Sequence, residues 1–116
     1  MVVARDERWL RVLEVTLRLG GLTPILRRSF AEARRTRVDD ARPGAIIIDL
    51  GNDSTPKEMM AARELQEELR TPVIVILPEA LAEQAQVFRN NGLRVVTRPY
   101  QPSTLYAALR GVAGPV

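Results

Sequence analysis

Two short apolar segments constrain the fold of this chain more than anything else in its sequence. Residues 45–50 and 72–77 are almost continuous aliphatic runs, rich in the β-branched residues isoleucine and valine. Runs of this kind are typical of parallel strands that helices cover on both faces, because neither face then needs polar side chains. We therefore predict two buried central strands of a parallel sheet.

Weaker strand patterns and clear helical patterns surround these two segments. The weaker strands are predicted over 2–4, 22–26 and 94–97, and the helices over 7–19, 30–39, 56–69 and 79–90 and from 102 to Gly114-Pro115. Leu10, Leu13 and Leu17 form the apolar stripe of the first helix. Thr55 and Glu58 form a capping box at the start of the third.

This alternation of strands and helices indicates an α/β protein. It predicts a five-stranded parallel sheet with right-handed crossovers and helices on both faces, the flavodoxin-like doubly wound (βα)5 architecture. A length of 116 residues fits one domain spanning 1–116.

Composition excludes several classes of function. The chain has no cysteine and no histidine, so disulfides, thiol nucleophiles and the commonest zinc ligand and general base are ruled out. No glycine-rich phosphate loop is present, which argues against a nucleotide-dependent enzyme. No apolar run approaches the roughly 20 residues that span a bilayer, and charged residues at 5–8 interrupt any signal peptide. We expect a cytoplasmic protein with no membrane contact.

The basic residues are concentrated in the first third of the chain. Residues 1–42 hold ten arginines against six acidic residues. Such an excess can indicate binding of nucleic acid or of an acidic partner. Only two Phe and two Tyr accompany the arginines, so a base-stacking surface is poorly supported.

Polar residues follow three of the predicted strands where a ligand site is expected. In sheets of this type, ligands bind beyond the carboxyl ends of the strands. Asp6 follows the first strand, Asp49 ends the third and Arg98 follows the fifth. Two carboxylates and a backbone carbonyl, such as that of Gly51, suit Mg²⁺, and a guanidinium can neutralise a transferring phosphoryl group. Equally, Arg5 or Arg98 can pair with Asp49 in an ion pair that binds no ligand.

In this order and at these spacings, the segments resemble the CheY-like receiver domains of two-component signalling. The resemblance covers essentially the whole chain. It is carried by the acidic end of the first strand (Arg5-Asp6-Glu7), the Ile46-Ile47-Ile48-Asp49-Leu50 segment, the Pro72–Leu77 strand and Thr97-Arg98-Pro99-Tyr100. It implies that Asp49 is the phosphoacceptor position and that Asp6 contacts a metal. It also implies that Arg98 stands at the family's lysine, before a cis proline.

Departures from the family pattern affect the switch itself. Arg5 stands at the first acidic position, where we expect it to compete with Mg²⁺ for Asp6 and Asp49, so that Mg²⁺ binds weakly or not at all. Sliding the register by one residue would restore an acidic pair but would put Arg11 on the buried helical stripe, so we prefer the first register. The family's Ser/Thr, which binds the phosphoryl oxygen, is replaced by Leu77.

These features predict an atypical receiver, or pseudo-receiver, acting mainly as a protein-interaction module and not as an enzyme. Its partners would be a histidine kinase or an output protein. By resemblance, the contact surface is the face of the fourth helix, fifth strand and fifth helix, with Tyr100, Tyr106 and Arg110 as candidates, and it could also form a homodimer. The alternatives are a functional phosphoacceptor using Asp49 with Mg²⁺, and a basic domain that binds nucleic acid or an acidic partner.

Overall fold

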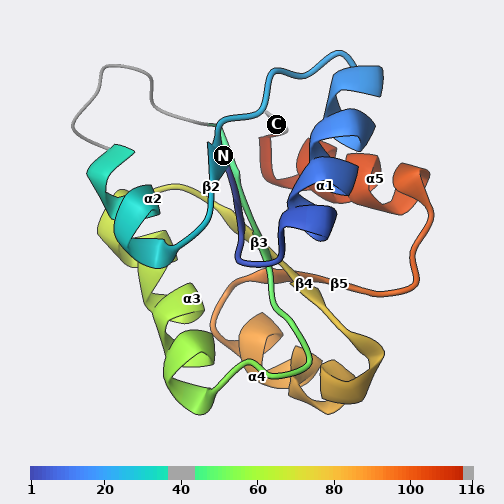
Figure 1. Cartoon of the computed structure of the whole chain (residues 1–116). Helices are drawn as coiled ribbons and strands as arrows, with labels where there is room; N and C mark the ends of the chain where they lie inside the picture. Colours follow the sequence, from blue (N-terminus) through green and yellow to red (C-terminus); the bar gives the residue numbers. More distant parts are fainter. Residues whose placement is uncertain (37–43, 114–116) are drawn as a thin grey trace.

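The protein is built on a five-stranded, entirely parallel sheet. A computed structural model describes residues 1–36 and 44–113. The strands are β1 (Val2–Ala4), β2 (Leu26–Arg27), β3 (Ile46–Asp49), β4 (Val73–Leu77) and β5 (Arg94–Thr97) (Figure 1). They lie in the order β2-β1-β3-β4-β5, with β3 at the centre. This is the flavodoxin-like order, and it confirms the predicted class of five-stranded parallel sheet.

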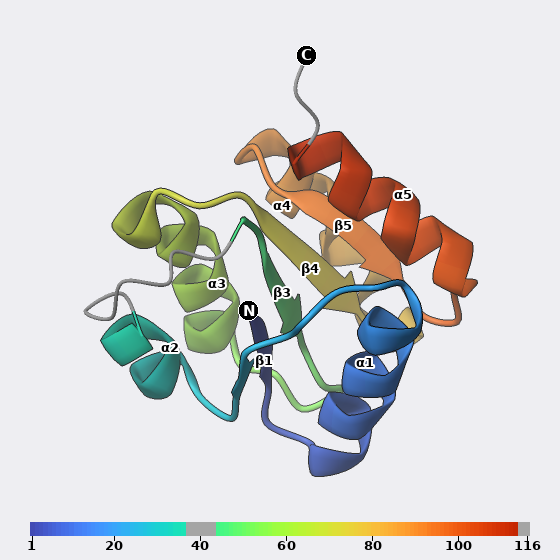
Figure 2. The same ribbon diagram turned by 90° about the horizontal axis from the view of Figure 1, so that it is seen from above.

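Helices cover both faces of the sheet. They are α1 (Glu7–Leu19), α2 (Phe30–Thr36), α3 (Pro56–Leu69), the 3₁₀ helix η1 (Glu79–Gln84), α4 (Ala85–Asn90) and α5 (Pro102–Ala113). Helices α1 and α5 lie on one face, and α2, α3 and α4 lie on the other (Figure 2). In the part of the chain that the structure describes, no helix is both long enough and apolar enough to cross a membrane.

The two faces bury separate apolar cores, as the uninterrupted strand sequences require. In β3, Ile47 points to the α1–α5 core, whereas Ile46 and Ile48 point to the core under α2, α3 and α4. Strand β4 alternates in the same way, and its five residues are all fully buried. Because side chains alternate between the faces of a strand, this double burial explains why β3 and β4 lack a polar stripe.

Polar caps fix the helices next to the carboxyl ends of the strands. The Asp6 carboxylate accepts a hydrogen bond from the Arg8 N–H at 2.9 Å. Asp6 is therefore the N-cap of α1, which begins shortly after β1. The predicted capping box of α3 is confirmed: the Thr55 hydroxyl accepts from the Glu58 N–H at 3.1 Å, and the Glu58 carboxylate accepts from the Thr55 N–H at 3.4 Å. Such caps satisfy N–H groups that have no partner inside the helix.

Two predicted elements differ from the structure. The strand predicted over 22–26 is only Leu26–Arg27, at the edge of the sheet, because Pro24 has no N–H and Leu22 is exposed. The helix predicted over 79–90 begins as η1 and becomes α-helical only at Ala85. No side chain caps η1, so its first N–H groups are satisfied by tighter bonds such as Leu81 N–H to Pro78 C=O, at 2.9 Å. The predicted ends of the second and last helices lie outside the described residues.

Candidate functional site

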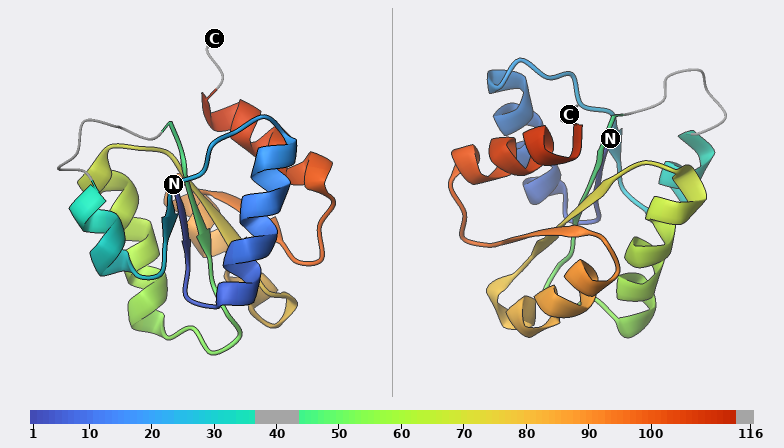
Figure 3. Two further views of the ribbon diagram at one scale, coloured as in Figure 1. Left: turned by 45° about the horizontal axis from the view of Figure 1, so that its top comes forward. Right: turned by 180° about the vertical axis from the view of Figure 1, so that it is seen from behind.

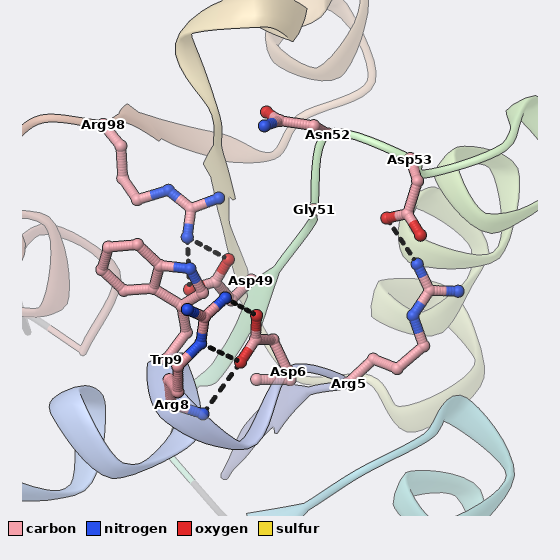
Figure 4. Close-up of a pocket in the computed structure, with 10 residues that line it drawn as sticks. Arg5, Asp6, Arg8, Trp9, Asp49, Gly51, Asn52, Asp53 and Arg98 are labelled. Atoms are coloured by element: carbon pink, nitrogen blue, oxygen red, sulfur yellow. Dashed lines mark hydrogen bonds and ion pairs between the residues drawn. The ribbon is translucent and has the colours of Figure 1, made fainter.

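The predicted site residues gather at the carboxyl edge of the sheet. A pocket of about 440 Å³ lies there, between the end of β1, the end of β3 and the segment after β5. It is lined by Ala4, Arg5, Asp6, Arg8, Trp9, Asp49, Gly51, Asn52, Asp53 and Arg98 (Figure 4). The loops after three strands therefore bring together side chains that are up to 93 positions apart in the sequence.

Asp49 is bound by Arg98 at the bottom of this pocket. One guanidinium nitrogen, Nη1, lies 2.9 Å from Oδ1 and 3.2 Å from Oδ2 of Asp49. The other, Nη2, donates to the Leu50 carbonyl at 3.0 Å. Only 4% of the Asp49 side chain and 12% of the Arg98 side chain are exposed. The sequence left open whether Arg5 or Arg98 pairs with Asp49, and the structure gives Arg98.

Trp9 holds the other side of the same guanidinium. Its ring centroid lies 4.3 Å from Cζ of Arg98, within the range of a cation–π contact (Figure 4). Arg98 is thus enclosed by an aromatic face, a carboxylate and a backbone carbonyl. A cation that makes all three contacts is fixed in position more firmly than an ordinary surface arginine.

Asp6 is also paired with a guanidinium. Its Oδ2 lies 3.1 Å from Nη2 of Arg8, while its Oδ1 accepts from the Arg8 N–H and, at 3.4 Å, from Nε. These contacts lower the pKa of Asp6, with the Arg8 side-chain hydrogen bond as the largest cause. Asp6 is therefore an ionised cap whose two oxygens both have donors.

Arg5 lies elsewhere than expected. Its Nη2 contacts Asp53 at 2.7 Å and its Nη1 contacts Glu58 at 3.3 Å, and 57% of its side chain is exposed. Figure 4 shows it directed away from Asp49. The expected competition of Arg5 for Asp49 is thus corrected: the competing cation is Arg98, because the chain turns after β1 and carries residue 5 toward α3.

Burial raises the pKa of Asp49 to about 6. The negative charge of Asp6 acts in the same direction, whereas the charge and hydrogen bonds of Arg98 oppose it. A carboxylate in an apolar surrounding loses hydration free energy, and its interaction with Arg98 compensates for only part of this loss. Asp49 is therefore mainly ionised at neutral pH and becomes protonated in mildly acidic solution.

The residues proposed for Mg²⁺ do not fit the ion in this arrangement. Asp6, Asp49 and Gly51 line one pocket, and carboxylate and carbonyl oxygens are suitable ligands for Mg²⁺. However, both oxygens of Asp49 accept from Arg98, and both oxygens of Asp6 accept from Arg8. Among the described residues, no group of three acidic side chains is placed to hold a metal. Two guanidinium groups would have to move before the ion could be bound.

Leu77, which stands where the family pattern has a hydroxyl, is part of the packed core. Leu77, at the end of β4, is fully buried in the core shared with α3 and α4. Its backbone carbonyl accepts from the Arg98 N–H at 2.8 Å. This residue therefore supports Arg98 through the backbone and offers no side-chain donor toward Asp49.

The three residues expected at an interaction surface differ in their exposure. Arg110 is exposed on α5. The Tyr106 hydroxyl instead donates to the Thr16 carbonyl of α1, and its ring packs against Gly20. Tyr100 is partly buried against the α1–α5 core, and burial raises the pKa of its hydroxyl.

Trp9 and Arg8 are site residues that the sequence reasoning did not single out. Both lie in the first turn of α1, directly after the Asp6 cap, so they face the same edge as Asp6. The signal that could have found Trp9 is its spacing of three residues from Asp6, which puts both side chains on one side of a helix start.

Comparisons with known proteins identify the fold. No protein-family model and no curated protein matches the sequence. The receiver domain of NtrX from Brucella abortus superposes with a TM-score of 0.83 at 15% identity, covering 99% of this chain and 98% of that one. A response regulator receiver domain from Clostridium thermocellum gives 0.81 at 18% identity, covering 97% and 90%.

A third structure carries a metal in its site. It is the receiver domain of a sensor histidine kinase from Pseudomonas aeruginosa, with a magnesium ion coordinated in its active-site cleft. Its TM-score is 0.73 at 23% identity, and the alignment covers 98% of this chain and 95% of that one. The chain thus has the CheY-like, flavodoxin-like fold of receiver domains, as the sequence predicted.

Proposed function

We propose that this protein is an atypical receiver, a protein-interaction module of two-component-type signal transduction that does not depend on phosphorylation of Asp49. The observation that carries the proposal is the Arg98 guanidinium, which binds both oxygens of Asp49 and the Leu50 carbonyl. A phosphoryl donor must approach the same carboxylate oxygens. Arg98 therefore blocks the nucleophile and the metal position together.

Leu77 also supports the proposal of an atypical receiver. A phosphorylated receiver needs contacts that differ between its two states, because a ligand shifts an equilibrium only by its differential affinity. By resemblance, the family's hydroxyl supplies such a contact. Leu77 has no hydroxyl and is held in a packed core, so a phosphoryl group on Asp49 would gain no new partner there.

The partners of such a module are other signalling proteins, either a histidine kinase or an output protein. The protein would catalyse nothing beyond self-phosphorylation and dephosphorylation at Asp49, and we expect these to be slow. Its place of action would be the cytoplasm.

The test is incubation with Mg²⁺ and acetyl phosphate, followed by intact mass measurement. We expect the wild-type protein and Asp49→Ala to show the same unchanged mass. Arg98→Lys serves as the comparison, since an ammonium on a flexible stem has no second nitrogen to hold the Leu50 carbonyl while it contacts Asp49, and no planar group to lie against Trp9. We expect that variant to gain a phosphoryl group. A stoichiometric gain by the wild type that disappears in Asp49→Ala would overturn the proposal.

A functional phosphoacceptor is the second candidate, and one observation favours it. Asp6, Asp49 and Gly51 line the same pocket, so the carboxylates needed for Mg²⁺ are close together if Arg98 and Arg8 move away. Titration with Mg²⁺ alone, followed by the amide resonances of residues 49–53, distinguishes the two candidates. Saturable shifts in the wild type would favour the phosphoacceptor, and shifts seen only in Arg98→Lys would favour the atypical receiver.

The ion pairs weaken the third candidate, a nucleic-acid or acidic-partner binder. Several arginines of the first third already contact carboxylates: Arg5, Arg8, Arg11, Arg18, Arg28 and Arg34. Neutralised arginines release fewer counterions from a polyanion, so binding should be weak. An affinity that falls steeply with salt concentration would restore this candidate.

A further inference from the structure

The outer face of α1 is apolar. Among the described residues, seven large hydrophobic side chains are exposed, and five of them lie on α1 or in the turn that follows it. These five, which we call the α1 stripe, are Trp9, Val12, Val15, Leu19 and Leu22. They are separate from the leucines that α1 buries in the core. Helix α1 therefore has two apolar sides, and only one of them is used by the fold.

The spacing of the α1 stripe is that of a helix–helix contact. Within the helix, Val12, Val15 and Leu19 follow one another at intervals of three and four residues, and Leu22 comes after its end. This is the repeat of the apolar seam between two packed helices. Exposed apolar side chains that are scattered singly need no explanation, but a contiguous patch commonly marks an interaction surface.

The two ends of the stripe have complementary shapes. At its carboxyl end, Leu19 projects with 81% of its surface exposed. At its amino end lies a groove of about 540 Å³, between α1 and the segments that follow β4 and β5. Trp9 and Val12 form one wall of the groove, and Pro78, Pro99 and Tyr100 contribute to the other. Figure 3 shows α1 at the outside of the molecule, beside α5.

The charges around the stripe cancel. Residues 6–19 contain three arginines and three acidic residues, whereas the whole chain has a net charge of +3. These residues are joined in ion pairs: Arg8 with Asp6, Arg11 with Glu7 and Glu14, and Arg18 with Glu14. A second copy of this surface would meet no excess of like charge, which otherwise opposes contact between identical surfaces.

We infer that the α1 stripe is a homodimer interface. Two copies pack their α1 helices antiparallel about a two-fold axis near Val15. This puts the projecting Leu19 of each copy into the groove beside Trp9 of the other. A two-fold contact requires a self-complementary surface, and a projection at one end with a hollow at the other meets that requirement. The inference does not rest on the proposed function. It uses a different surface from the face formed by α4, β5 and α5. Of the seven exposed large hydrophobic residues in the described part of the chain, only Val87 lies on that face.

Sedimentation velocity over a range of concentrations up to about 1 mM tests the interface. We expect the wild type to pass from monomer to dimer. In Leu19→Glu the dissociation constant should rise at least about tenfold, because a carboxylate must be buried in an apolar groove. Met60→Glu is the matched control, an equal change at an exposed apolar residue on α3, and it should dimerise like the wild type. A wild type that stays monomeric throughout, or a dimer that Leu19→Glu leaves intact, would overturn the inference.

Two further measurements locate the contact. The chain has no cysteine, so Val15→Cys carries a single thiol near the proposed axis and should form a disulfide-linked dimer under mild oxidation. Val87→Cys should stay monomeric at the same concentration. Trp9 is the single tryptophan, and its emission should shift to shorter wavelength as the wild type dimerises but stay constant in Leu19→Glu. Faster cross-linking through Val87→Cys than through Val15→Cys would place the interface on α4 and refute the proposal.

Discussion

At the scale of single residues, the site is decided by which guanidinium reaches Asp49. The sequence places Arg5 and Arg98 next to the same sheet edge, and either could pair with the acid. Arg98 makes the contact because its backbone N–H is fixed to the Leu77 carbonyl and Trp9 covers its guanidinium. Arg5 finds Asp53 and Glu58 instead. Such choices depend on distances of a few ångströms between loops, which a linear sequence does not contain.

The raised pKa of Asp49 leads to a prediction about stability and pH. The folded state holds a proton at Asp49 up to a pKa of about 6, against 3.8 for the ordinary side chain. Between these values the folded state binds more protons than the unfolded state, so stability rises as the pH falls. From pH 7 to pH 5 the wild type should gain about 1 kcal/mol relative to Asp49→Asn, which cannot titrate.

Urea unfolding of both proteins at the two pH values measures this difference. Comparison with Asp49→Asn removes the contributions of the other carboxylates, including Asp6, whose lowered pKa acts with the opposite sign. An equal response of the two proteins to pH would mean that Asp49 titrates at its ordinary value.

At the scale of the elements, sequence signals were reliable where local chemistry alone defines the structure. The capping box at Thr55, the stripe of Leu10, Leu13 and Leu17, and the strands β3 and β4 are all present. Edge strand β2 was placed too early, because Pro24 interrupts the predicted segment and only Leu26 and Arg27 pair with β1. The first half of the 79–90 helix is 3₁₀, which the apolar pattern could not distinguish from α-helix.

The cap of α3 gives a prediction at this scale. Thr55→Ala removes the hydroxyl that accepts from the Glu58 N–H, and should destabilise the protein by about 1 kcal/mol. Thr55→Ser keeps the hydroxyl and should cost much less. Thermal unfolding of both variants checks this. Equal losses would indicate that packing of the threonine methyl group, and not the cap, accounts for the effect.

The contact between α1 and α5 gives a second prediction at the scale of the elements. Gly20 lies so close to Tyr106 that an added Cβ would stand 2.7 Å from Cε1 of the ring, whose hydroxyl is hydrogen-bonded to the Thr16 carbonyl. Gly20→Ala should therefore destabilise the protein by about 1–3 kcal/mol through overpacking. In a Tyr106→Ala background the same change should cost much less, because the ring is gone. Urea unfolding of the four proteins in this double-mutant cycle measures the coupling, and additive losses would contradict the contact.

At the scale of the whole molecule, the chain shares the fold of receiver domains, and the proposed function depends on two positions at which it departs from the family pattern. The chain superposes on receiver domains with TM-scores of 0.73 to 0.83 at 15–23% identity, so this fold tolerates wide sequence change. These two positions, Leu77 and Arg98, lie where β4 and β5 end side by side. Under the proposed function, they separate events at Asp49 from the outer surface of the molecule.

This separation can be tested by hydrogen exchange over the whole chain, with and without Mg²⁺ and acetyl phosphate. We expect no change in the wild type. The double variant Leu77→Thr/Arg98→Lys provides a hydroxyl and frees the carboxylate, so treatment should alter protection in residues 78–84 and 97–101. The same double variant with Asp49→Ala is the control and should not respond. A fixed guanidinium leaves a phosphoryl group no contact that differs between two conformations of the protein. If the wild type nevertheless responded as strongly as the double variant, Arg98 would be a mobile partner of Asp49, which would contradict the proposed separation.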